Sequence, residues 1–212
     1  MINLICKSCG SDFSAFPSDI KKYGCRNDSI KQFCSKKCRS KFAHDRRKEP
    51  LTQKVLHSLI DYRPETGEMF WKVKMGRCEV GERAGCLTPQ GYYRITIYQN
   101  HYAGHHLAWL YVYGYFPENI DHKNNQRHDN RIENIREATT EENSFNRRIQ
   151  SNNKIGFKGV TKYENIKKKK YRAQITKRGK VRVLGYFYTA EEAHAAYVEA
   201  GLKLHGEFFN SG

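Results

Sequence analysis

The sequence predicts a modular α+β fold in which small units follow one another along the chain. Two short cysteine pairs lie near the N-terminus, and the middle of the chain mixes helix-like and strand-like patterns. The C-terminal part is strongly basic, with strand periodicity followed by a helical stripe. Since only 38% of the 212 residues are hydrophobic, several modules fit better than one large core.

The first segment, residues 1–48, carries cysteines at metal-binding spacing. Cys6-x-x-Cys9 and Cys34-x-x-x-Cys38 enclose 24 residues, and each pair can present two thiolates to one tetrahedral ion. Seven cysteines without a secretion signal favour thiols or metal over disulfides. Four buried cysteines without metal are the alternative, which polar neighbours disfavour: Lys7, Ser8, Lys36 and Lys37.

The stretches CKSCGSDF and FCSKKCRSKF resemble treble-clef or ribbon-type zinc fingers. This resemblance implies one structural Zn²⁺ held by the four cysteines. Cys25 lies within the same segment and stays open as a substitute ligand. Cys78 and Cys86 have no partner pair nearby, so we expect them to be free thiols.

The central segment, residues 51–149, should contain the largest core. It holds both tryptophans, Trp71 and Trp109, and most of the bulky aliphatic residues. A helix is expected from about Leu107 to Tyr113. Three histidines near its start are read as structural, with a histidine there able to cap the helix: His101, His105 and His106.

Polar residues between 121 and 146 have a spacing suited to a metal-dependent site. Asp121 offers a hard oxygen ligand, and the adjacent His122 offers a base that titrates near neutrality. Asn134 follows twelve residues after His122, and Asn143 nine residues later. A hairpin followed by a helix would bring these four side chains together. His128 and Asp129 are expected to be exposed loop residues.

The helix that carries Asn143 has a recognisable start. Thr139-x-x-Glu142 is a capping box, which places Asn143 in the first helical turn. We expect this helix to run to about Arg148, followed by a polar linker at residues 150–154.

The same residues, with Ile135-Arg136 and Asn146, resemble the HNH endonucleases, particularly homing enzymes encoded by phages and introns. The resemblance implies a ββα-metal core at about residues 115–149. It makes His122 the general base and Asp121 and Asn143 the ligands of a catalytic divalent ion, Mg²⁺ or Mn²⁺. Asn134 would brace the loop and orient the histidine.

Stretches upstream also resemble that family: TGEMFWK, GYYRITI and HHLAWLYVYGYFP. One departure is His106, which stands where the family commonly has arginine. Arg136 and Arg147 are candidates for additional phosphate contacts.

The last segment, residues 155–212, predicts three strands backed by one helix. Strands are expected near Lys158–Thr161, at Tyr171–Thr176 and at Val181–Phe187, with a basic turn between the last two. A second capping box at Thr189 opens a helix that ends near Gly206. One exposed face would carry Arg172, Gln174 and Arg182. Ala173, Ile175 and Val183 would pack on the helix.

This segment resembles the Apetala/ethylene-response-factor DNA-binding domain, through Gly159-Val160, Leu184-Gly185-Tyr186-Phe187 and the helix that follows. The resemblance implies a sheet that binds the major groove. Tyr171 stands where that family frequently has tryptophan. The implied DNA-binding residues are Arg172, Gln174, Lys177, Arg178, Lys180 and Arg182.

Composition independently favours a polyanionic partner, because 38 Lys and Arg against 22 Asp and Glu give a net charge of +16. We expect duplex DNA as the partner and no membrane, since no apolar run approaches the roughly 20 residues of a bilayer span. A monomer is favoured, with a dimer left open. A cytoplasmic, phage-encoded protein in a bacterial host is expected.

Two alternatives stay open beside a DNA endonuclease. The first is a noncatalytic, sequence-biased DNA-binding regulator that uses the zinc finger and the C-terminal domain. The second is RNA binding or cleavage, which is disfavoured because the strands offer no aromatic stacking platform.

Overall fold

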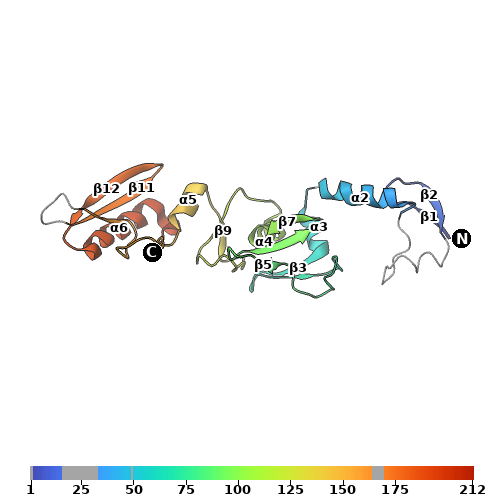
Figure 1. Cartoon of the computed structure of the whole chain (residues 1–212), viewed down its shortest axis with the longest axis horizontal. Helices are drawn as coiled ribbons and strands as arrows, with labels where there is room; N and C mark the ends of the chain where they lie inside the picture. Colours follow the sequence, from blue (N-terminus) through green and yellow to red (C-terminus); the bar gives the residue numbers. More distant parts are fainter. Residues whose placement is uncertain (1, 16–32, 49, 164–169) are drawn as a thin grey trace. The chain divides into compact units, whose positions relative to one another are not determined.

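The computed structural model of the chain describes residues 2–15, 33–48, 50–163 and 170–212. The chain divides into two compact units, residues 1–52 with 96–102 and residues 53–95 with 103–212. Helices and strands are mixed throughout (Figure 1), which confirms the predicted α+β class. None of the described helices is long and apolar enough to cross a bilayer.

The N-terminal part of the chain contains an antiparallel pair and a helix: β1 (Ile2–Ile5), β2 (Asp12–Ala15) and α2 (Lys36–Lys48). A tight turn joins the two strands. The amide of Cys6 donates to the carbonyl of Ser11 at 2.9 Å, and the amide of Gly10 donates to the carbonyl of Cys6 at 2.9 Å. Cys25 lies outside the described residues.

The central part begins with α3 (Gln53–Leu59) and the antiparallel strands β3 (Ile60–Arg63) and β4 (Glu68–Trp71). Next come β5 (Cys86–Leu87), β6 (Tyr93–Ile97), β7 (Asn100–Ala103) and α4 (Gly104–Tyr113). Trp71 and Trp109 are both buried, as predicted, together with Leu56, Ile60 and Leu107.

Helix α4 starts earlier than the sequence suggested. Its N-cap is Ala103, which provides no side-chain cap, so the prediction that a histidine caps this helix is wrong. Gly104 lies at the first helical position, and a Cβ there would lie 2.7 Å from the side-chain amide of Asn130. A residue larger than glycine at this position would require the Asn130 side chain to shift. His105 and His106 therefore lie inside the first turn.

The elements that follow α4 are β8 (Ile120–His122), β9 (Ile135–Glu137) and α5 (Thr140–Phe145). β8 and β9 form the expected hairpin, and the Thr139–Glu142 capping box is present in both directions. Helix α5 ends at Phe145 and not near Arg148. The side chain of Asn146 instead bonds to β8, which draws the chain out of the helical path.

The C-terminal strands are β10 (Val160–Lys162), β11 (Tyr171–Lys177) and β12 (Lys180–Phe187), antiparallel and in that order. Helix α6 (Ala190–His205) backs this sheet and leads into the 3-10 turn η1 (Gly206–Phe208) (Figure 1). Val160, Ala173, Ala190 and Ala193 form the buried centre. Three strands backed by one helix is the predicted arrangement.

A β-bulge at Leu184 of β12, opposite Ala173 and Gln174, changes which residues of β12 face the helix. Val183 lies opposite Gln174 and is 45% exposed, so the prediction that it packs on α6 is wrong. Arg182 lies opposite Ile175, not on the face of Arg172 and Gln174. The bulge adds one residue to the register and so reverses the simple alternation beyond it.

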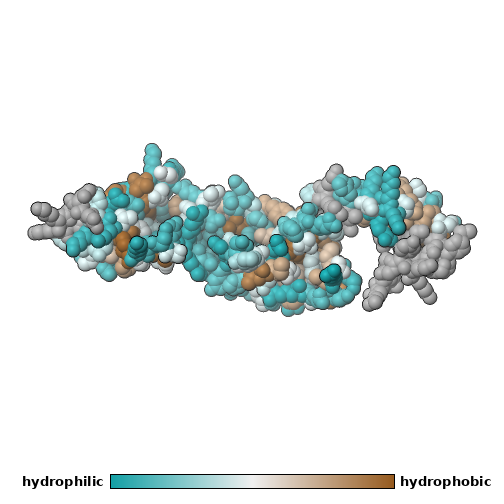
Figure 2. Space-filling view, in the orientation of Figure 1, coloured by the Kyte–Doolittle hydropathy of each residue, from teal (hydrophilic) through white to brown (hydrophobic). Residues whose placement is uncertain are grey.

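The outer surface is mostly hydrophilic, with apolar patches interspersed on the face drawn in Figure 2. This matches a composition in which charged residues make up 28% of the chain.

Candidate nuclease site

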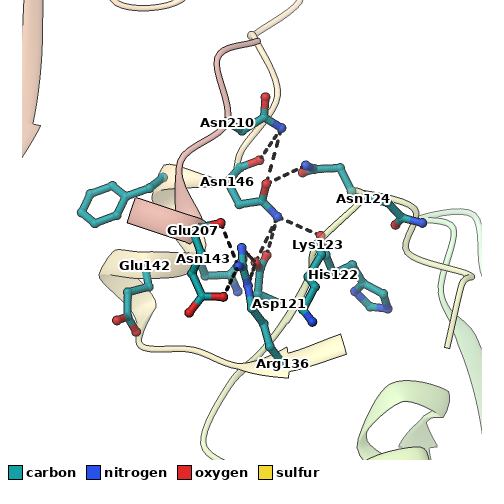
Figure 3. A network of polar contacts seen from close by, with 12 residues as sticks. Asp121, His122, Lys123, Asn124, Arg136, Glu142, Asn143, Asn146, Glu207 and Asn210 are labelled. Atoms are coloured by element: carbon teal, nitrogen blue, oxygen red, sulfur yellow. Dashed lines mark hydrogen bonds and ion pairs between the residues drawn. The ribbon is translucent and has the colours of Figure 1, made fainter. Parts of the chain in front are cut away.

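The β8–β9 hairpin and α5 bring the predicted site residues into one region. In the register of the hairpin, Asp121 pairs with Arg136 and His122 with Ile135. Asp121 and His122 are consecutive in a strand, so their side chains leave it on opposite faces. Figure 3 shows the imidazole turned away from the Asp121 carboxylate.

A cleft of about 830 Å³ opens beside the hairpin and α5. Asp121, His122 and Asn143 all line it, which brings together three of the four residues singled out from the sequence. Its wall also carries four basic or titratable side chains: Arg127, His128, Arg147 and Arg148. A cleft with this lining attracts a phosphate backbone.

Asp121 is only 4% exposed, and its two oxygens accept unequal numbers of hydrogen bonds. Oδ2 accepts from Arg136 Nε at 2.9 Å, from a terminal nitrogen of Arg136 at 2.8 Å and from the amide of Asn146 at 3.0 Å. Oδ1 accepts one bond, from Asn146 at 2.9 Å. A carboxylate has about four lone-pair sites. Oδ1 therefore keeps room for one further ligand.

Asn143 is half-buried in the first part of α5, and its amide donates to the carbonyl of Ile120 at 3.4 Å. Within the described part of the chain its Oδ1 accepts no hydrogen bond. A carboxylate oxygen and an amide oxygen on one cleft wall are ligands suited to a hard divalent cation. The donor set thus fits Mg²⁺ or Mn²⁺.

Asn134 is buried at the end of the loop, before β9. Its Oδ1 accepts from the amide of Asn124 at 3.1 Å, and its side-chain nitrogen donates to the carbonyl of Asp129 at 2.8 Å. These bonds tie the loop together. Neither goes to the imidazole, so Asn134 affects His122 only through the loop backbone.

His122 is 6% exposed, and its Nε2 has no hydrogen-bond partner in the described part of the chain. Burial lowers the pKa of its imidazole, and the charge of Asp121 acts in the opposite direction. Desolvation disfavours the charged form. The neutral imidazole, which can accept a proton, is therefore favoured at neutral pH.

His105 is a neighbour of His122 that sequence reasoning treated as structural. The two rings are edge to face with centroids 5.0 Å apart, and Tyr92 lies 6.1 Å from His122. Burial, and then repulsion by His122, lower the pKa of His105 to about 3. His105 is therefore a neutral side chain packed against the ring of His122. The position of His105 beside apolar helical residues in the sequence did not indicate its contact with His122.

Two predicted loop and phosphate-contact residues have different surroundings from those expected. Asp129 was expected to be exposed, yet its side chain is 11% exposed and is held by Arg131. Arg136 was a candidate phosphate contact, but its side chain is only 12% exposed and its guanidinium is paired with Asp121. Arg147 is exposed and lines the cleft, so it remains a candidate phosphate contact.

A second cluster lies in the N-terminal part, where the sulfur atoms of Cys6, Cys9, Cys34 and Cys38 lie within 4.8 Å of one another. The Sγ atoms of Cys9 and Cys34 are 3.7 Å apart, and those of Cys34 and Cys38 are 3.5 Å apart. Tetrahedral Zn–S bonds of about 2.3 Å require sulfur separations close to these. The cluster fits Zn²⁺, while Cys78 and Cys86 are free thiols.

The predicted DNA-binding residues lie on the C-terminal sheet and its turn. Arg172 donates to Thr161 at 3.3 Å, and Lys177 donates to the carbonyl of Leu204 at 3.0 Å. The backbone amide of Arg178 donates to the carboxylate of Glu141, and the Arg178 side chain is exposed. Lys180 and Arg182 are exposed and Gln174 is half-buried.

Comparison with known proteins gives one family match. Residues 102–145 match a family model described as HNH endonuclease, which supports a nuclease that acts on DNA. The matched stretch includes Asp121, His122, Asn134 and Asn143. No curated protein and no solved structure matches the chain.

Proposed function

We propose that the chain is a metal-dependent DNA endonuclease of the HNH homing type, which hydrolyses a phosphodiester of duplex DNA. The observation that carries this proposal is the shared cleft, where Asp121, His122 and Asn143 meet beside exposed basic side chains. The family match over residues 102–145 supports it.

In this mechanism His122 is the general base, which takes a proton from the attacking water. Its buried, neutral imidazole and its unpartnered Nε2 suit that role. Arg147 and its neighbour Arg148 bind the backbone phosphates and hold the strand in the cleft. Asn134 keeps the loop in the shape that presents the base.

Asp121 and Asn143, which both line the cleft, would hold the divalent ion through their Oδ1 atoms. The bound ion supplies charge neutralisation at the phosphate and at the leaving 3′-oxygen. Arg136 and Asn146 keep the Asp121 carboxylate fixed by hydrogen bonds.

The flanking modules would select the site of cutting. We infer a four-cysteine zinc finger at residues 1–48, a nuclease domain at 51–149 and an Apetala/ethylene-response-factor-like domain at 155–212. An HNH motif contacts few base pairs, so appended surfaces must provide most of the selectivity. The exposed side chains of Arg178 and Lys180, in the turn between β11 and β12, suit DNA contacts.

A noncatalytic DNA-binding regulator is the second candidate. The ion pair between Arg136 and Asp121 favours it, because the carboxylate already has a structural partner. The free position on Oδ1 and the unpartnered Nε2 of His122 favour the nuclease.

A cutting assay on supercoiled plasmid DNA distinguishes the endonuclease from the noncatalytic regulator. Wild-type protein should nick or linearise it with Mg²⁺ and leave it intact with EDTA. His122→Ala should slow cutting by about 100-fold or more, the range for loss of a general base. His101→Ala is the matched control, since His101 is an exposed histidine that does not line the cleft. Wild-type protein that shifts DNA on a native gel but never cuts it, with Mg²⁺ or Mn²⁺, would favour the regulator.

A further inference from the structure

The two residues that hold the Asp121 carboxylate are themselves held by the C-terminal end of the chain (Figure 3). The contacting residues, 206–210, comprise η1 and the two residues after it and are called the C-terminal strap here. They follow α6 directly. Their contacts form two arms, one through Arg136 and one through Asn146.

The first arm surrounds the guanidinium of Arg136. The guanidinium donates two hydrogen bonds to Asp121 on one side. On the other side, one of its terminal nitrogens donates to the backbone carbonyl of Glu207 at 2.8 Å. The ring of Phe208 lies under the guanidinium, 3.8 Å from its carbon to the ring centroid. A planar cation stacked on an aromatic ring and bonded on its edges has little freedom to turn.

The second arm fixes the amide of Asn146. Its nitrogen donates to both Asp121 oxygens and to the carbonyl of His122 at 2.8 Å. Its Oδ1 accepts from Asn125 at 2.9 Å and from Asn210 at 3.4 Å, and Asn210 also donates to the Asn146 carbonyl at 3.2 Å. Asn210 thus helps to set which way the Asn146 amide points.

The strap is fastened to the end of α5 by contacts outside both arms. The ammonium of Lys158 donates to three carbonyls, those of Phe145, Arg147 and Asn210. The ring of His205 stacks on Phe145 with centroids 3.5 Å apart. These contacts join the strap to the last turn of α5, the helix that carries Asn143.

We propose that the C-terminal strap is a positioning element of the nuclease site, which orients Asp121 through Arg136 and Asn146. This inference rests on the proposed metal role of Asp121. Groups that orient a metal ligand typically affect metal affinity or activity about 10–100-fold. The catalytic centre is therefore incomplete without the C-terminal strap, although the strap does not contact the Oδ1 atoms of Asp121 and Asn143.

The test uses full-length Asn210→Ala and Phe208→Ala, with Phe208→Tyr as a conservative variant that keeps the ring. Glu207→Gln is the matched control, because that side chain is 74% exposed and reaches Arg136 only at 3.5 Å. Two quantities are measured: Mn²⁺ binding to the DNA-free protein by electron paramagnetic resonance, and the Mg²⁺ concentration for half-maximal cutting. DNA affinity is measured in parallel, with circular dichroism as the folding check.

Asn210→Ala and Phe208→Ala should weaken Mn²⁺ binding and raise the required Mg²⁺ by about ten-fold or more. DNA affinity should stay within about two-fold, and Phe208→Tyr and Glu207→Gln should match wild type. The inference is overturned if folded Asn210→Ala and Phe208→Ala bind Mn²⁺ and cut like wild type. If wild type binds Mn²⁺ at this site but never cuts, the proposed function is wrong, and the Mn²⁺-binding measurements on the variants still test the role of the strap. If wild type does neither, both are overturned.

Discussion

Individual side chains at the site are held in place by hydrogen bonds. In the loop between β8 and β9, Asp129 is held by two other residues of the same loop. Its carboxylate accepts from Arg131 at 2.9 and 2.8 Å and from Asn124 at 2.7 Å. Mainly through the hydrogen bond from Arg131, the pKa of Asp129 is lowered to about 2. Asp129 in turn accepts no proton until the solution is strongly acidic.

This shift predicts an acid-dependent contribution to stability. Because the folded pKa lies below the unfolded value, the contribution is present above about pH 4 and lost as the pH falls through about 2. Asp129→Asn should cost about 1–2 kcal/mol at pH 7, or roughly 3–6 °C in the unfolding midpoint. Melts at pH 7 and pH 2 should show the difference shrinking in acid. Glu133→Gln is the control, since Glu133 also bonds Arg131 but is 71% exposed; an equal loss in both variants would contradict the assignment.

The helices and strands show which features were accessible from sequence. Both capping boxes, at Thr139 and Thr189, predicted the starts of α5 and α6, because the signal lies within four consecutive residues. The hairpin that presents Asp121 and His122 was expected from the spacing of the site residues and from the family resemblance, and β8 and β9 form it.

Features that depend on distant residues could not be predicted in this way. Arg136 lies 15 residues from Asp121, and Asn210 lies 64 residues from Asn146, with no local pattern linking either pair. The early end of α5 follows from the same long-range bonds. The bulge at Leu184 of β12 left no sequence signal either, so Val183 was assigned to the wrong face.

The short helix α5 depends on its cap, which yields a test of how it presents Asn143. Thr139→Ala should remove about 1 kcal/mol of capping and, by loosening Asn143, slow single-turnover cutting roughly ten-fold or more. Thr189→Ala removes the equivalent cap from α6, which has 16 residues and carries no cleft ligand. It should destabilise the protein to a similar degree without slowing cutting. Equal rates for the two variants would show that the α5 cap has no role in the site.

Over the whole molecule, a net charge of +16 makes DNA affinity strongly salt-dependent. Each phosphate contact that is removed should lower the slope of log affinity against log salt by about one. The double variant Arg178→Ala with Lys180→Ala should therefore lower it by about two. Lys203→Ala is the control, because Lys203 is exposed on α6 and paired with Glu199. An unchanged slope in the double variant would exclude the basic turn from the DNA interface.

The most direct measurement is the single-turnover rate of DNA cutting against Mg²⁺ concentration for wild type, Asp121→Ala and Asn143→Ala, at saturating DNA. If these residues hold the ion, wild-type cutting should depend on Mg²⁺ and both variants should lose about 100-fold or more in rate at a given Mg²⁺ concentration, with DNA affinity retained. Asp121→Ala protein that is folded, binds DNA and cuts as fast as wild type across the Mg²⁺ range would contradict a metal-dependent site built on this carboxylate.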